Sequence, residues 1–79
     1  MTILEAIEVE TQRARLLFPD FKSPHEGYDV ILEEVDELWE EVKAGKPDAP
    51  RLAEMRKEAI QVAAMALRFL IDVCGEELA

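Results

Sequence analysis

The segment from Ala59 to Val73 constrains the fold of this chain more than any other feature. Its polar residues are Gln61, Arg68 and Asp72, and spacings of seven and four place them on one stripe of a helix. The rest of that helix is apolar, so it must be covered on several sides. The segment is also too short to span the roughly 30 Å hydrocarbon core of a bilayer. It therefore predicts a helix that is buried inside a protein.

Proline and glycine divide the chain into three segments with helical periodicity. We expect helices at about 2–18, 24–44 and 49–73. Ser23 followed by Pro24 is typical of a helix start, with a serine N-cap and a proline at the first helical position. The connection between the second and third helices is short, so these two helices should be antiparallel.

A chain of 79 residues forms one domain, at 1–79, and a core of this size is marginal without a disulfide, a metal or a partner subunit. Cys74 is the single cysteine, which excludes an internal disulfide, and we expect it to be buried near the C-terminal cap. We predict an all-α, three-helix protomer that forms a four-helix-bundle core by homo-oligomerisation, as a dimer or tetramer. The alternative is that the first helix covers the third alone, with its apolar stripe of Ile3, Ile7, Ala14 and Leu17.

Acidic residues outnumber basic ones by 18 to 9, which gives a net charge of -9. With 49% hydrophobic residues the composition is that of an acidic globular protein. Such a charge repels phosphate backbones and anionic lipids, so we expect neither a nucleic-acid polymer nor a membrane as partner. Residues 1–8 lack the positive cluster of a secretory signal, and we expect a cytoplasmic protein.

Seven of the thirteen residues at 29–41 are acidic and none is basic. Glu34 and Glu37 lie one turn apart beside an apolar stripe that should face the third helix, where Glu58 and Gln61 have the same spacing. Carboxylates about 6 Å apart repel by roughly 3 kcal/mol at an effective dielectric of about 20, and a divalent ion relieves this repulsion. Oxygen ligands favour Mg²⁺ or Mn²⁺ over zinc. Two more glutamates share these faces, Glu41 and Glu54.

A second interpretation of the same residues is an acidic helix face that is simply solvated. Five nearby basic residues offer ion-pair partners of little net energy: Lys43, Lys46, Arg51, Arg56 and Lys57. A ferritin-like di-iron site is disfavoured, because it needs Glu-x-x-His on a helix and His25, the single histidine, lies at a helix start.

Two stretches carry a resemblance to a known family: Glu33-Glu34-Val35-Asp36-Glu37-Leu38 and, about twenty residues later, Lys57-Glu58-Ala59-Ile60-Gln61-Val62. Together they resemble the MazG-like, all-α nucleoside triphosphate pyrophosphohydrolase superfamily, whose signature is Glu-x-x-Glu, a spacer and Glu-x-x-Asp. By this match the first pair is Glu34 and Glu37, the second pair begins at Glu58, and Gln61 stands where the family has aspartate.

The resemblance implies a magnesium-dependent enzyme that converts a nucleoside triphosphate into a monophosphate and pyrophosphate. Glu34 and Glu37 would be catalytic, and Mg²⁺ (or Mn²⁺) on the carboxylates would hold the triphosphate while a water attacks the α-phosphorus. The implied metal ligands are Glu34, Glu37, Glu58 and Gln61. Because an acidic protein holds an anionic nucleotide only with help from cations, basic residues of the third helix become candidates for phosphate oxygens, namely Lys57, Arg56 and Arg68.

Gln61 offers a metal only a neutral oxygen. Its role could pass to Glu54 or Asp72, or the chain could be a catalytically silent helical interaction module that forms homo-oligomers. The base of a nucleotide could stack on aromatic side chains near the start of the second helix, although such residues usually belong to cores or interfaces. These residues are Phe21, His25, Tyr28 and Trp39.

Overall fold

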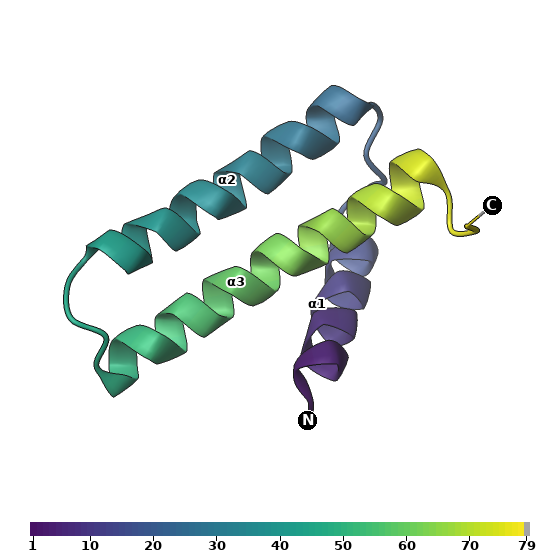
Figure 1. Ribbon diagram of the computed structural model, residues 1–79. Helices are drawn as coiled ribbons and strands as arrows, with labels where there is room; N and C mark the ends of the chain where they lie inside the picture. The colour runs from purple at the N-terminus through teal and green to yellow at the C-terminus, as the bar shows by residue number, and fades with distance from the viewer. Residues whose placement is uncertain (79) are drawn as a thin grey trace.

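The computed structural model describes residues 1–78 and shows three helices with no strand in that part of the chain. Helix α1 spans Ile3–Leu17, α2 spans Pro24–Lys43 and α3 spans Ala49–Phe69. A π-helical turn, η1, continues α3 over Leu70–Cys74. The all-α architecture predicted from the periodicity is confirmed (Figure 1).

Local signals in the sequence explain where each helix begins. Thr2 and Glu5 form a reciprocal capping box at the start of α1. The Ser23 hydroxyl accepts a hydrogen bond from the Glu26 N–H, which confirms the predicted N-cap of α2. Asp48 caps α3 in the same way through its side chain.

Helices α2 and α3 lie side by side as an antiparallel hairpin, and α1 packs across α3 on one side of that hairpin (Figure 1). Gly27 lets the two long helices approach closely, because a Cβ atom there would lie 2.6 Å from Cδ2 of Phe69. The buried apolar core is small and lies where α1, the α1–α2 loop and α3 meet. It consists of Ala14, Phe21, Ala64 and Met65.

Helix α1 contacts α3 through its central turns and not along its whole length. Thr11 and Ala14, in its middle, are buried, whereas Ile3 and Leu17 are exposed. The apolar stripe of α1 is therefore only partly covered in the protomer. Because α1 crosses α3 steeply, it makes contact only along its central turns (Figure 1). The predicted burial of Cys74 is wrong, because this side chain is exposed.

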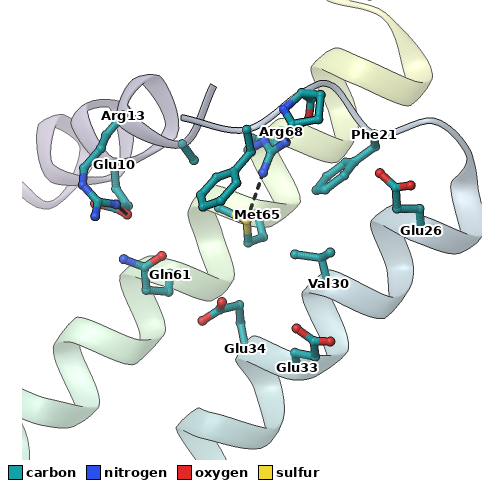
Figure 2. Close-up of a pocket in the computed structure, with 13 residues that line it drawn as sticks. Glu10, Arg13, Phe21, Glu26, Val30, Glu33, Glu34, Gln61, Met65 and Arg68 are labelled. Atoms are coloured by element: carbon teal, nitrogen blue, oxygen red, sulfur yellow. Dashed lines mark hydrogen bonds and ion pairs between the residues drawn. The ribbon is translucent and has the colours of Figure 1, made fainter. Parts of the chain in front are cut away.

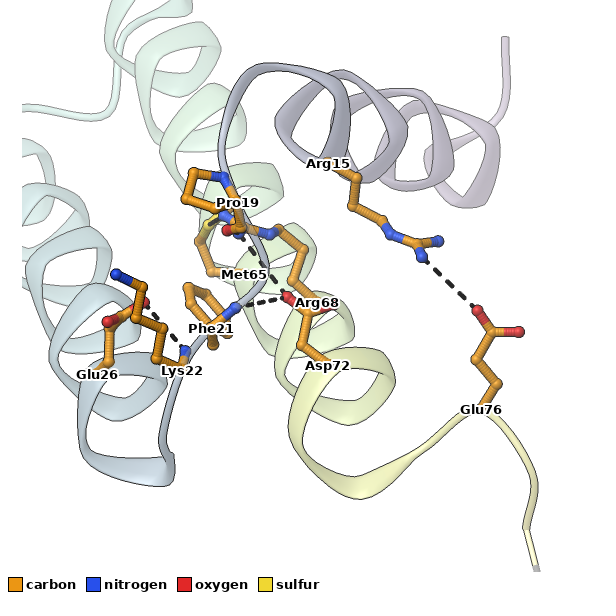
Figure 3. A network of polar contacts seen from close by, with 9 residues as sticks. All are labelled: Arg15, Pro19, Phe21, Lys22, Glu26, Met65, Arg68, Asp72 and Glu76. Atoms are coloured by element: carbon orange, nitrogen blue, oxygen red, sulfur yellow. Dashed lines mark hydrogen bonds and ion pairs between the residues drawn. The ribbon is translucent and has the colours of Figure 1, made fainter.

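The α1–α2 loop is held on α3 by a buried ion pair, which we call the loop clamp: Arg68 and Asp72 (Figure 3). The Arg68 Nη2 donates to the Pro19 carbonyl at 2.9 Å, and the guanidinium lies 4.2 Å from the centre of the Phe21 ring. An oxygen of Asp72 accepts a hydrogen bond from the Phe21 N–H at 3.0 Å. Two residues of the polar stripe seen in the sequence, Arg68 and Asp72, thus anchor a loop.

The opposite side of the hairpin is apolar and exposed, and we call it the open face. On α2 the apolar side chains recur at spacings of four and three, and on α3 small and large apolar residues follow the same helical stripe. Residues on both helices that turn away from α1 make up this face: Tyr28, Leu32, Val35, Trp39 and Val42 from α2, and Leu52, Ala59, Ala66 and Leu70 from α3 and η1.

Candidate metal centre

Three glutamates from the two long helices converge on one point, and we call them the carboxylate triad: Glu34, Glu37 and Glu58. Each offers one carboxylate oxygen, and these oxygens all lie within 4.8 Å of one another. The antiparallel register of α2 and α3 produces this arrangement, since Glu34 and Glu37 are one turn apart on α2 and Glu58 faces them from α3. An all-oxygen donor set of this kind fits a hard divalent cation such as Mg²⁺ or Mn²⁺.

Electrostatics show that the triad carries uncompensated negative charge. Burial, followed by repulsion from Glu37, raises the pKa of Glu34 to about 7. Burial and a hydrogen bond with Glu37 also raise the pKa of Glu58, while the ammonium group of Lys57 opposes this shift. Among residues 1–78 no salt bridge reaches a triad member. A bound dication would therefore relieve repulsion in the folded protein.

The neighbouring acidic residues behave differently. Glu40 forms a 3.0 Å salt bridge with Lys43, and Glu41 pairs with Arg51 across the hairpin. The interpretation of the acidic run as a solvated, ion-paired face is thus correct for these two residues. It does not extend to the triad, where no such partner is found in the described residues.

A cavity of about 420 Å³ adjoins the triad, and we call it the loop cavity because the α1–α2 loop forms one wall (Figure 2). Glu34 belongs to both the triad and the wall of this cavity. Gln61, one turn after Glu58 on α3, lines the cavity opposite Glu34. Its other prominent walls come from Phe18, Phe21, Val30, Met65 and Arg68.

The structure separates the remaining candidate ligand-binding residues. Lys57 is exposed next to Glu58 and lines a second, more open cavity beside α1. Arg68 is only 3% exposed and is engaged with the loop. Tyr28 lies on the open face, about 120° around α2 from Glu34, so it is brought to neither the triad nor the loop cavity.

The other residues considered as metal ligands or stacking groups are divided among the loop clamp, the loop cavity and the exposed surface. Asp72 belongs to the loop clamp, and Gln61 turns toward the loop cavity. Of the four aromatic candidates, Phe21 lines the loop cavity, whereas His25 and Trp39 are exposed outside it.

Sequence reasoning missed most of the loop cavity. Phe18, Val30 and Met65 looked like ordinary apolar positions, and they become one wall only when α1 folds across α3. One signal did exist: Arg68 and Asp72 are four residues apart on an otherwise apolar helix. Buried polar side chains need hydrogen-bond partners, and main-chain groups of a neighbouring loop can supply them. A buried Arg–Asp pair therefore indicates a place where a loop packs against the helix.

Comparisons with known proteins give no further guide to the site: no protein-family model, no curated protein and no solved structure matches the chain. Within residues 1–78, no helix has both the length and the apolar character needed to cross a bilayer.

Proposed function

We propose that this protein is a divalent-metal-dependent nucleoside triphosphate pyrophosphohydrolase that acts as a homo-oligomer. The observation that carries the proposal is the convergence of Glu34, Glu37 and Glu58 within 4.8 Å on two facing helices. Their charge has no salt-bridge partner in the described residues, and a cavity large enough for an organic ligand begins at Glu34. Together these features support a site for a metal-bound anion that also carries an apolar part.

The residues present fit Mg²⁺ or Mn²⁺, which would neutralise both the carboxylates and the triphosphate. Glu37 on α2 and Glu58 on α3 would bind the cation from the two facing helices. Glu34, the triad member that also lines the loop cavity, is suited to accept the proton of a water that attacks the α-phosphorus. The new bond joins that water oxygen to phosphorus, the bond to the β-phosphate oxygen breaks, and pyrophosphate leaves.

Lys57 is the basic residue best placed to contact phosphate oxygens. Its ammonium group lies close enough to lower the pKa of Glu58, and the side chain is exposed and free to move. Arg68 is less suited to that role, because it is buried and donates to the Pro19 carbonyl. We therefore assign Lys57 to the phosphates and exclude Arg68 from this role.

The open face supports the oligomeric part of the proposal. Trp39 is 56% exposed, and large apolar side chains continue along both helices of the hairpin on this side. A second hairpin packed here would complete a four-helix bundle and leave the triad on the outer side of each pair. The same face is compatible with a second candidate, a catalytically silent interaction module that forms homo-oligomers.

Pyrophosphate release separates the two candidates. The purified protein is incubated with the common ribo- and deoxynucleoside triphosphates in Mg²⁺ or Mn²⁺, and monophosphate and pyrophosphate are measured together. We expect hydrolysis of at least one nucleotide, and we expect Glu37→Gln to lower kcat/KM by about 100-fold or more. Glu40→Gln is the matched control, because Glu40 is a nearby glutamate outside the triad. No turnover of any nucleotide, or equal loss in both variants, would favour the interaction module.

A further inference from the structure

The carboxylate triad has a further acidic neighbour on α2. Glu41 follows Glu37 by four residues and Glu34 by seven, so the three side chains lie on one stripe of the helix. Glu41 is nonetheless outside the group of carboxylates whose oxygens lie within 4.8 Å of one another. Its charge still reaches that group, because it contributes to the raised pKa of Glu58. A fourth carboxylate therefore lies beside the triad without belonging to it.

Glu41 is held by Arg51. The Arg51 guanidinium forms a salt bridge with Glu41 across the hairpin, and both side chains are partly buried. Arg51 lies in the first turn of α3, beside the α2–α3 connection, where its N–H donates to the Asp48 carboxylate that caps the helix (Figure 1). Because Arg51 precedes Glu58 by seven residues, about two turns, the salt bridge holds Glu41 on the side of the hairpin connection.

A fourth carboxylate would change what the metal site can hold. Mg²⁺ prefers octahedral oxygen coordination, and in phosphoryl-transfer sites it takes few carboxylates and leaves positions for water and substrate phosphate. Side chains four residues apart on a helix are about 5–6 Å apart at Cβ, close enough for both carboxylates to reach one ion. Glu41 on the ion would fill a position and add a charge that repels the triphosphate. Its release would therefore tighten metal binding and weaken nucleotide binding.

We propose that Arg51 is a positioning residue that holds Glu41 off the divalent ion and so leaves a coordination position for the substrate phosphate. The part played by the phosphate rests on the proposed function. The effect on metal affinity does not need a nucleotide, because Arg51 acts on the triad through Glu41 alone. Loss of Arg51 then strengthens metal binding, whereas a general structural defect weakens it.

Calorimetric titration of Mn²⁺ into the purified protein measures this effect. We expect Arg51→Gln to lower the Kd for Mn²⁺ about fivefold, a size set by the small net energy of a partly exposed ion pair. The same small energy means that the variant stays folded. Arg51→Lys keeps a positive charge beside Glu41 and should bind Mn²⁺ within about twofold of wild type. Lys43→Gln is the matched control, because it removes one positive charge and the salt bridge to Glu40 near the same end of the hairpin, and its Kd should be unchanged.

Double variants test whether the gain depends on Glu41. In the Glu41→Gln background, Arg51→Gln should change the Kd by less than about twofold, because no fourth carboxylate remains to be released. Glu54→Gln is the matched background: Glu54 precedes Glu58 by four residues and forms no salt bridge within the described residues. There Arg51→Gln should keep its gain. A gain that persists without Glu41 would overturn the proposal, because Arg51 would then act through its own charge.

The relaxation of water protons gives a second readout. Bound Mn²⁺ speeds this relaxation through the water molecules that it holds directly, and an added carboxylate displaces one of them. The enhancement per bound Mn²⁺ should therefore be lower in Arg51→Gln than in wild type, and Glu41→Gln added to that variant should restore it. An equal enhancement in wild type and Arg51→Gln would overturn the release of Glu41.

Steady-state hydrolysis separates this inference from the proposed function. At saturating metal, Arg51→Gln should raise KM for the nucleotide more than it lowers kcat, because the substrate phosphate loses a position on the ion. Tighter Mn²⁺ binding in this variant without hydrolysis by any form of the protein would support the role of Arg51 and overturn the proposed reaction. Hydrolysis with an unchanged or weaker Mn²⁺ affinity in Arg51→Gln would overturn the role of Arg51 alone. No Mn²⁺ binding by any form would overturn both.

Discussion

The two sides of the α2–α3 hairpin differ in what covers them. On one side α1 and the loop close over α3, so that Ala64 is fully buried and Arg68 is almost so. On the other side nothing in residues 1–78 covers the apolar stripes, and Leu70 is 52% exposed. One helix pair therefore presents a polar, enclosed side that suits ligand chemistry and an apolar, open side that suits association.

Because the two sides differ in this way, ligand binding at the triad and loop cavity can be tested separately from self-association through the open face. The triad and the loop cavity use residues that turn toward α1, and the open face uses residues about a third of a turn away on the same helices. Substitutions on one side leave the side chains of the other in place. The predictions below use this separation.

The largest effect is expected on the open face. Trp39→Ala removes the largest exposed apolar side chain of α2, and we expect it to weaken self-association by about 100-fold, or about 3 kcal/mol. Light scattering and sedimentation over a range of concentrations give the measurement. Leu16→Ala is the control, because Leu16 is also apolar and exposed but lies on α1, away from the open face. A cooperatively folded wild-type monomer of 9 kDa would contradict the association argument.

The next effect concerns the enclosed side. Mn²⁺ or Mg²⁺ should raise the melting temperature, since an ion at ten times its Kd that binds only the folded state stabilises it by about 1.4 kcal/mol. For a domain of this size, each 1 kcal/mol raises Tm by about 4–8 °C. Glu37→Gln should abolish the shift, and Glu40→Gln should preserve it. Thermal unfolding with and without the ion checks this, and an unchanged shift in Glu37→Gln would remove the triad as the metal site.

The smallest effect is the pH dependence of the metal-free protein. The folded-state pKa values of Glu34 and Glu58 lie above their ordinary value of 4.5, so the folded state binds more protons than the unfolded state between about pH 4.5 and 7. Stability should therefore fall as pH rises through this window and level off above about pH 7. Screening by water limits the contribution of Glu34 to about 1 kcal/mol.

Glu34→Gln tests the origin of that pH dependence. The variant should flatten the decline and make the metal-free protein more stable at pH 8, because it removes one of the repelling charges. Denaturant unfolding in EDTA at pH 5 and pH 8 gives the comparison, with Glu40→Gln as the control. A variant less stable than wild type at pH 8 would mean that Glu34 makes a favourable contact outweighing the repulsion.

The sequence predicts the hairpin and the triad for the same reason. Helical periodicity and the cap at Ser23 are local signals, and a short connection makes α2 and α3 antiparallel. Once two long helices are antiparallel, the three- and four-residue spacing of glutamates on each is enough to place Glu34, Glu37 and Glu58 together.

The position of α1 could not be predicted in this way. Its apolar residues indicate a buried stripe but not the angle at which it crosses α3, and that angle leaves Ile3 and Leu17 exposed. The loop cavity depends on this crossing and on contacts between residues far apart in the chain. The helical segment ends at Cys74, within one residue of the expected end, but the change from α- to π-helix at Leu70 has no local sequence signal.

The loop clamp also imposes an order on folding. Phe21 and Asp72 are 51 residues apart, so their hydrogen bond closes a loop that includes both long helices. The hairpin can form from neighbouring segments, whereas the cavity wall depends on the last helical turn having docked. During synthesis from the N-terminus, the ligand-binding side is therefore completed only after Asp72 has emerged, later than the part of the open face that lies on α2.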